Sequence, residues 1–296
     1  MNIATLLFPD FTLILLGFLL KRYASFGDPF WAGLEKMVYY VLFPPLLFYA
    51  VSHTPFDFVA TGKLLQVALT AIVCAIILGW LAKPLFRPGP MIFESGVQTA
   101  FRFNSYIALA VASRLGGDEG TSLMALIIGC GVPICNAAAV HALVHKSGGL
   151  FREMLKNPLI VATAAGMIFN VFGLHYPEIV GATLSRLGNA SLALGLTAVG
   201  AGLQWSGLLE SKAIAGYFLL VKLLLLPAIG YSLGRWFELP TLQLQILVTF
   251  CALPTASSAY VLATRMGGNG PFVAFLVSAS TILSVATLPM WLALAH

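Results

Sequence analysis

The sequence predicts an all-α membrane protein with ten transmembrane helices, arranged as two inverted five-helix repeats whose fourth and ninth helices are broken. The first observation is composition: 59% of the residues are hydrophobic and 9% are charged, whereas soluble domains carry about 25% charged residues. The second is that no polar stretch is long enough for a soluble domain. The third is a pair of matching polar interruptions, one in each half of the chain.

Ten stretches have the length and apolar character of a membrane span, which needs about 20 residues. They are residues 3–20, 35–53, 63–85, 92–115, 119–145, 156–175, 181–203, 211–234, 240–265 and 270–293. Lys21 and Arg22 follow the first apolar run instead of preceding it, so we expect a span there and not a signal peptide.

Basic residues set the expected orientation. The odd-numbered loops carry ten of them: Lys21, Arg22, Lys36, Lys83, Arg87, Lys146, Arg152, Lys156, Lys212 and Arg265. The even-numbered loops carry four: Lys63, Arg114, Arg186 and Arg235. Because basic loops stay in the cytoplasm, we expect a multi-pass protein with both termini outside.

A weak internal repeat has an offset of about 150 residues. Residues 112–117, Ala-Ser-Arg-Leu-Gly-Gly, align with residues 263–268, Ala-Thr-Arg-Met-Gly-Gly. Five spans per repeat is an odd number, so the two halves have opposite membrane orientation. The predicted repeats are residues 1–146 and residues 147–296.

Both halves contain an interrupted span. The residues of the two interruptions are Arg102, Asn104 and Ser105 in the fourth span and Pro254, Thr255, Ser257 and Ser258 in the ninth. A proline removes a backbone donor, and non-helical backbone is tolerated at membrane depth only beside protein or a water-filled cavity. Corresponding interruptions in two repeats indicate a substrate site.

Arg102 is the strongest candidate binding residue. A cation near the bilayer centre costs at least ~2.5 kcal/mol and normally faces a cavity or a partner. A guanidinium binds a carboxylate through two hydrogen bonds, which favours an anionic substrate. The alternative is a structural tie to carbonyl groups that the broken helix leaves free.

The polar residues beside the two breaks have the side chains expected of helix N-caps. The N-termini of the two second half-helices would direct N–H groups and positive dipole ends at one point, a site suited to a carboxylate. The alternative is that these residues only cap the half-helices and bond to neighbouring helices.

Further candidates lie in other spans. Lys222, in the middle of the eighth span, would add positive charge or replace a coupling cation, or would be a neutral buried amine. Asn136 in the fifth span is a candidate for the cavity wall, with helix packing as the alternative. Tyr106 and Tyr260 could line the same cavity, although aromatic residues in spans usually pack.

Other functional classes lack their signatures. No carboxylate lies at the centre of a span, as a cation/proton antiporter would need, and no H-E-x-x-H or G-x-S-x-G motif is present. The four cysteines lie in apolar segments without a C-x-x-C pair. We therefore expect no enzyme activity, no metal, no cofactor and no nucleic-acid partner.

Several segments resemble the auxin efflux carrier family in its bacterial form, related to the plant PIN-FORMED carriers. They are Leu16–Arg22, Phe101–Asn104, Val132–Asn136, Asn157–Ile160, Lys222–Pro227 and Ala252–Gly268. Their order and spacing are more specific than any one of them. The fourth span lacks the proline that plant members have, so its break depends on Asn104 and Ser105.

The resemblance implies an elevator-type carrier of small organic anions such as malonate, malate or auxin-like acids. It also implies that the fourth and ninth helices cross, that helices 1, 2, 6 and 7 form a scaffold, and that helices 3–5 and 8–10 form a transport unit. The corresponding location is the bacterial inner membrane.

Three functions stay open from the sequence. The first is a secondary transporter of a small carboxylate, coupled to a proton or sodium. The second is a sodium-coupled symporter of the bile-acid type, and the third is a membrane sensor without flux. Besides the lipid bilayer, a second copy of the chain is an expected partner, since the small residues of the seventh span could form a dimer face.

Overall fold

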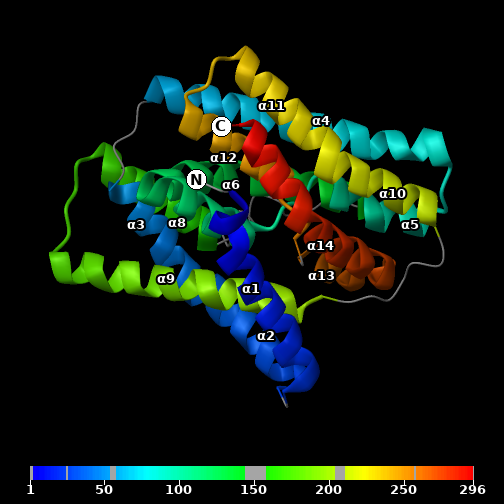
Figure 1. Cartoon of the computed structure of the whole chain (residues 1–296), viewed down its shortest axis with the longest axis horizontal. Coiled ribbons are helices and arrows are strands. Elements are labelled where there is room, and N and C mark those ends of the chain that lie inside the picture. The colour runs from blue at the N-terminus through cyan, green and yellow to red at the C-terminus, as the bar shows by residue number, and fades with distance from the viewer. Residues whose placement is uncertain are drawn as a thin grey trace.

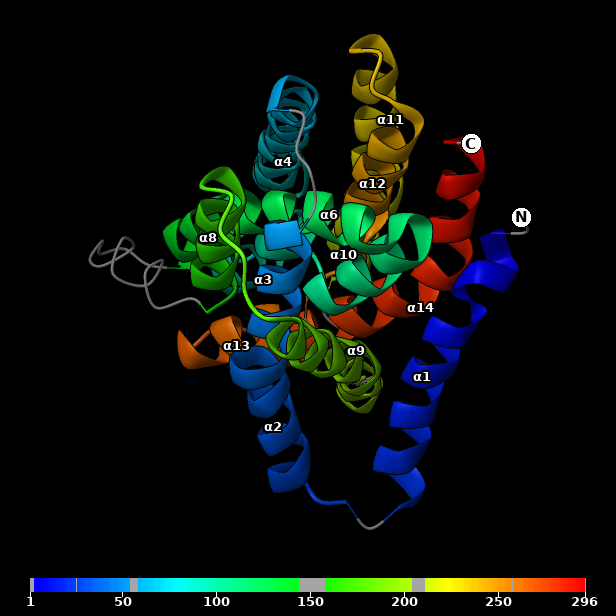
Figure 2. The ribbon, with the colours of Figure 1, turned by 90° about the vertical axis from the view of Figure 1, so that its left-hand side faces the viewer.

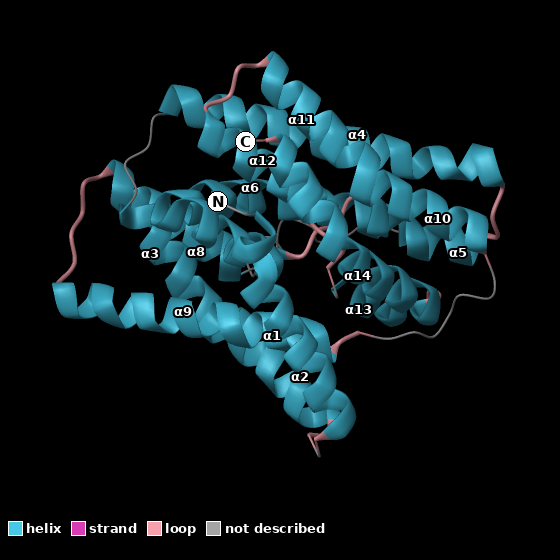
Figure 3. Cartoon of the chain, viewed as in Figure 1, coloured by secondary structure: helices cyan, strands magenta, loops and turns pink. Residues whose placement is uncertain are grey.

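The fold is entirely helical in the part of the chain that the structure describes (Figure 3). The structure is a computed structural model that describes residues 3–24, 26–53, 58–143, 158–203, 211–256 and 258–295. Its elements are α1 (Ile3–Tyr23), α2 (Asp28–Met37), η1 (Val38–Leu42), α3 (Phe43–His53), α4 (Phe58–Phe86), α5 (Pro90–Gly96), η2 (Val97–Ala100), α6 (Ser105–Leu143), α8 (Pro158–Val171), α9 (Glu178–Ala201), α10 (Lys212–Leu220), η3 (Val221–Leu225), α11 (Leu226–Trp236), α12 (Thr241–Ala252), α13 (Ser258–Arg265) and α14 (Gly270–Leu294).

Six helical segments of the described chain are long and apolar enough to cross a membrane. They are Asp28–Ser52, Thr61–Phe86, Pro90–Leu143, Glu178–Ala201, Lys212–Trp236 and Gly270–Leu294. Shorter apolar helices span Val161–Val171 and Thr241–Ala252. The chain is therefore a multi-pass helical membrane protein, while the total of ten spans and the inverted repeat stay predictions.

The helices pack in two groups. The first contains α1, α3, α8 and α9, and the second contains α4, α10, α11, α12 and α14. In both views α4 and α11 lie at the top, α2 and the last turns of α1 lie at the bottom, and the first turns of α1 lie near the end of α14 (Figures 1 and 2). Helix α6 contacts both groups, so it connects them.

Small residues bring α1 and α9 into backbone contact. A Cβ atom at Gly17 would overlap the carbonyl oxygen of Thr197, and one at Gly200 would overlap the carbonyl oxygen of Ile14. Gly200 belongs to the small-sided face of the seventh predicted span, and Gly17 lies opposite it on α1. Because α1 covers that part of the face within one chain, Gly200 is not available there to a second copy.

Two glycine pairs interrupt helices at similar places in the two halves. Gly117 has φ of 55° inside the long element α6, and Gly267 has φ of 75° just after α13. Positive φ is readily adopted by glycine, since it lacks a Cβ atom. Both glycines lie in the Gly-Gly pairs that the proposed repeat aligns.

Candidate functional site

Two unwound segments meet inside the protein. The first runs from Phe101 to Asn104, between η2 and α6, and the second follows the end of α12 at Ala252. The main-chain N–H of Asn104 donates to the carbonyl oxygen of Pro254 at 2.9 Å. The hydroxyl of Thr255 donates to the carbonyl oxygen of Thr99 at 2.8 Å. The fourth and ninth predicted spans therefore contact each other where each is broken.

Asn104 explains why α6 begins where it does. Its side-chain oxygen accepts from the N–H groups of Tyr106 at 3.0 Å and Ile107 at 3.2 Å. This is the capping role that the sequence predicts, and it satisfies two of the donors that a helix start leaves free. With 3% of its surface exposed, Asn104 holds the break in place and has no side-chain acceptor turned toward solvent.

The second break is held by a different set of contacts. Pro254 has no N–H to donate, and the N–H of Thr255 donates to the hydroxyl oxygen of Ser280 on α14 at 3.1 Å. Thr255 is 1% exposed. Ser257 lies outside the described residues, and Ser258 begins α13.

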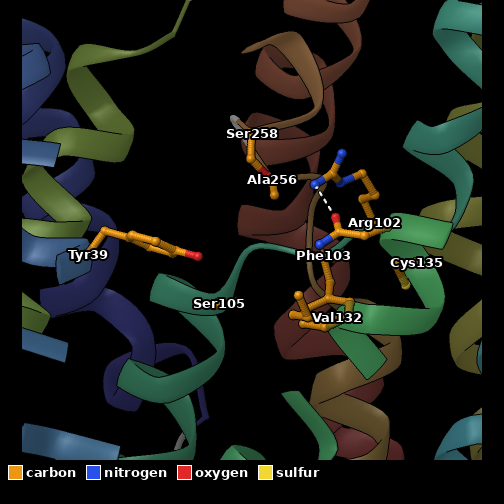
Figure 4. Close-up of a pocket in the computed structure, with 9 residues that line it drawn as sticks. Tyr39, Arg102, Phe103, Ser105, Val132, Cys135, Ala256 and Ser258 are labelled. Atoms are coloured by element: carbon orange, nitrogen blue, oxygen red, sulfur yellow. Dashed lines mark hydrogen bonds between the residues drawn. The ribbon is translucent and has the colours of Figure 1, made fainter. Parts of the chain in front are cut away.

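A cavity of about 170 Å³ lies beside the meeting point of the two breaks (Figure 4). Its lining residues are Tyr39, Arg102, Phe103, Ser105, Val132, Cys135, Asn136, Ala256 and Ser258. Both broken spans contribute to it, together with the second and fifth predicted spans. Cavities for drug-sized ligands are larger, about 300–1,000 Å³, so this one suits a small molecule.

Arg102 brings an uncompensated positive charge to the cavity wall. One terminal nitrogen of its guanidinium donates to the Gln98 side-chain oxygen at 3.0 Å, and the other donates to the Asn136 side-chain oxygen at 2.8 Å. Both partners are neutral amides. Among the described residues no carboxylate lies within ion-pair distance of Arg102. The two amides therefore orient the guanidinium without neutralising it.

Tyr39 is a cavity residue that the sequence analysis missed. It lies in η1 of the second predicted span, and its hydroxyl points across the gap toward the side of the cavity that carries Arg102 (Figure 4). The sequence signal for Tyr39 was a phenol within an apolar span. The neighbouring Tyr40 gives the same signal, although it is 62% exposed and does not line the cavity. Only the tertiary contacts separate the two tyrosines.

Five of the predicted site residues that the structure describes do not border the cavity: Asn104, Pro254 and Thr255, which hold the two breaks, and also Tyr106 and Lys222. Tyr106 packs its ring against Phe43, with centroids 4.8 Å apart, which favours the packing alternative. Lys222 lies in the π-helical turn η3 with 1% of its surface exposed.

In the part of the chain that the structure describes, no group of three or more histidine, cysteine, aspartate or glutamate side chains is arranged to hold a metal ion. The polar side chains that line the cavity carry a guanidinium, an amide, a thiol and three hydroxyl groups.

Comparison with known proteins adds evidence on the kind of protein. Residues 141–292 match the model of a family described as "Membrane transport protein". An "Uncharacterized transporter" of Methanothermobacter thermautotrophicus is 26% identical over 289 residues, covering 94% of each chain. A "Putative malonate transporter" of Rhizobium meliloti is 26% identical over 305 residues, covering 97% of this chain and 93% of the relative. "Uncharacterized transporter YfdV" of Escherichia coli is 23% identical over 303 residues, covering 97% of this chain and 95% of the relative.

Proposed function

The chain belongs to the membrane transport protein family of auxin efflux carriers, and we propose that it is a secondary active transporter of small organic anions. The observation that carries the proposal is the position of Arg102. Its guanidinium lines a small cavity between two broken helices, and it is held there by two neutral amides, Gln98 and Asn136. A carboxylate would supply the missing countercharge.

The size and chemistry of the cavity support the proposed substrate class. A volume of about 170 Å³ leaves room for a small mono- or dicarboxylate and not for a bulky acid. The relative named as a malonate transporter supports testing malonate first. In this proposal Arg102, Ser105, Asn136, Tyr39 and Ser258 contact the anion.

The remaining predicted residues have supporting roles. Asn104, Pro254 and Thr255 hold the two breaks together, and Lys222 adds positive field from its buried position. Helix α6 directs its N-terminal dipole end toward the cavity, because Ser105 is both its first residue and a lining residue.

We propose alternating access by an elevator motion across a bacterial inner membrane, with ten spans, inverted repeats and both termini outside. The mutual packing of α1, α3, α8 and α9 supports a scaffold formed by the first, second, sixth and seventh spans. The cavity supports motion between two bodies, because Tyr39 comes from the scaffold and the other lining residues from the opposing unit.

Reconstituted vesicles test the proposal. Purified protein in liposomes loaded with malonate is expected to exchange labelled external malonate, and Arg102→Gln is expected to abolish that exchange. The control is Arg235→Gln, which removes an exposed cation at the end of α11 and should leave exchange unchanged. Undiminished exchange by Arg102→Gln would refute the assignment of the site.

The same preparation separates the alternatives. A sodium-coupled symporter requires sodium, so replacing sodium by choline would stop its uptake. A sensor would be stabilised thermally by small carboxylates and would show no exchange. The screen therefore includes a series of mono- and dicarboxylates, each with and without sodium.

A further inference from the structure

A partly buried ion pair joins α1 to α6 outside the cavity. The Nε of Arg114 donates to Oδ2 of Asp10 at 2.7 Å. Arg114 lies nine residues beyond Ser105, about 14 Å along the helix axis. Asp10 lies two turns inside α1, and 4% of its surface is exposed. An ionisable residue inside a spanning helix normally has a partner, and for Asp10 that partner is Arg114.

The two members of the pair differ in exposure. The side chain of Arg114 is 36% exposed, whereas that of Asp10 is 6% exposed. Arg114 lies at the end of the fourth predicted span, next to a predicted loop, so water can hydrate its guanidinium if the pair separates. The carboxylate stays buried, where an unpaired charge is strongly unfavourable and the group takes up a proton instead.

Arg114 is the residue that decides the charge of Asp10. Helix α1 packs against α6, α9 and α14. The charged and histidine side chains on the described parts of these helices are Arg114, Asp118, Glu119, His141, Glu178 and Arg186, and α14 has none. Of these, Arg114 is the one that lies within ion-pair distance of Asp10. The protonation of Asp10 therefore depends on whether α6 stays in contact with α1.

We propose that Asp10 is the proton-binding site that couples transport to a proton gradient. When α6 moves away from α1, the hydrogen bond from Arg114 breaks and a proton from water binds to Oδ2 of Asp10. When the helices meet again, Arg114 displaces that proton to water and the pair re-forms. This inference rests on the proposed function, since it requires α6 to move relative to α1.

Proton-driven uptake is the first test. Vesicles that are more acidic outside should accumulate labelled malonate about tenfold more per pH unit than vesicles without a gradient, as expected for one proton per anion. For Asp10→Asn the ratio of uptake with and without the gradient should fall to one. The matched control is Asp28→Asn, which removes a carboxylate that is 92% exposed and pairs with Lys21, and should keep the full ratio.

The outcomes separate this inference from the proposed function. Malonate exchange without any response to the gradient in the unsubstituted protein overturns the coupling site and leaves the transporter assignment intact. A full gradient response in Asp10→Asn also overturns it. Absence of malonate exchange in the unsubstituted protein contradicts the proposed function.

A second measurement needs neither substrate nor flux. Infrared spectra of the detergent-solubilised protein are recorded through an acid titration, and the carbonyl band of a protonated carboxylic acid is followed. The unsubstituted protein should show a band that Asp10→Asn removes and Asp10→Glu retains at a shifted frequency. Identical titrations for the unsubstituted protein and Asp10→Asn would overturn the proposal.

Discussion

Asn104 and Pro254 lie 150 residues apart in the chain and share a main-chain hydrogen bond of 2.9 Å. The bond runs in one direction, because proline has no N–H with which to reciprocate. The second break instead uses the N–H of Thr255, which donates to Ser280 on α14. The two broken spans thus meet at one point, while each is held by different partners.

The cap at Asn104 should be measurable as stability. Asn104→Ala removes the acceptor for two N–H groups at the start of α6, and the expected loss is about 1 kcal/mol of unfolding free energy. Asn104→Ser keeps a capping oxygen and should lose much less. Thermal unfolding in detergent compares the two variants, and equal losses would contradict a capping role.

A negative charge beside Arg102 should weaken anion binding without unfolding the protein. Asn136→Asp keeps the acceptor for Arg102 and converts its neutral partner into a countercharge. We expect malonate affinity to fall at least about tenfold, equivalent to ~1.4 kcal/mol. Calorimetric binding measures the affinity. Asn136→Ala provides the comparison, since it removes the hydrogen bond to Arg102 and leaves the net charge of the cavity unchanged. A larger loss of malonate affinity for Asn136→Ala than for Asn136→Asp would contradict the charge argument.

The hydroxyl of Tyr39 should contribute to substrate binding. Tyr39→Phe removes one neutral hydrogen-bonding group from the cavity, worth about 0.5–1.5 kcal/mol, or about two- to tenfold in malonate affinity. Tyr40→Phe is the matched control, because its ring is 62% exposed on the same turn. Equal affinities for the two variants would remove Tyr39 from the site.

The contact between α1 and α9 should tolerate no added methyl group. Gly200→Ala would place a Cβ atom into the backbone of Ile14, and overpacking of this kind costs about 1–3 kcal/mol. Gly33→Ala on α2 meets no neighbouring atom and should be neutral or slightly stabilising. Yield and thermal stability in detergent compare the two, and a fully stable Gly200→Ala protein would contradict the packing.

The sequence predicts the parts of the site whose signal is local. Three residue types stand out within an otherwise apolar helical pattern: a proline inside an apolar run, an asparagine before a helix and an arginine at membrane depth. For this reason Arg102, Asn104 and Pro254 are recognisable, and the structure places all three at the meeting of the breaks. Tyr106 also disturbs the pattern, yet its ring packs against Phe43.

Tyr39 and Asp10 could not be identified from the local sequence. Tyr40 is chemically identical to its neighbour Tyr39, and Asp10 lies near the start of a span, where an acidic residue is unremarkable by sequence alone. Their importance comes from what faces them: a cavity in one case and Arg114 on another helix in the other.

Composition and periodicity by themselves determine that this chain is a helical membrane protein, because lipid forces each backbone polar group into local hydrogen bonds. The interrupted spans are likewise encoded locally, by proline and capping side chains. Only the tertiary structure decides which polar groups meet. Asn104 contacts Pro254, and Asp10 contacts Arg114, although each pair is separated by 100 or more positions in the chain. Such contacts depend on how the helices pack, and the order of residues along one helix does not specify that packing.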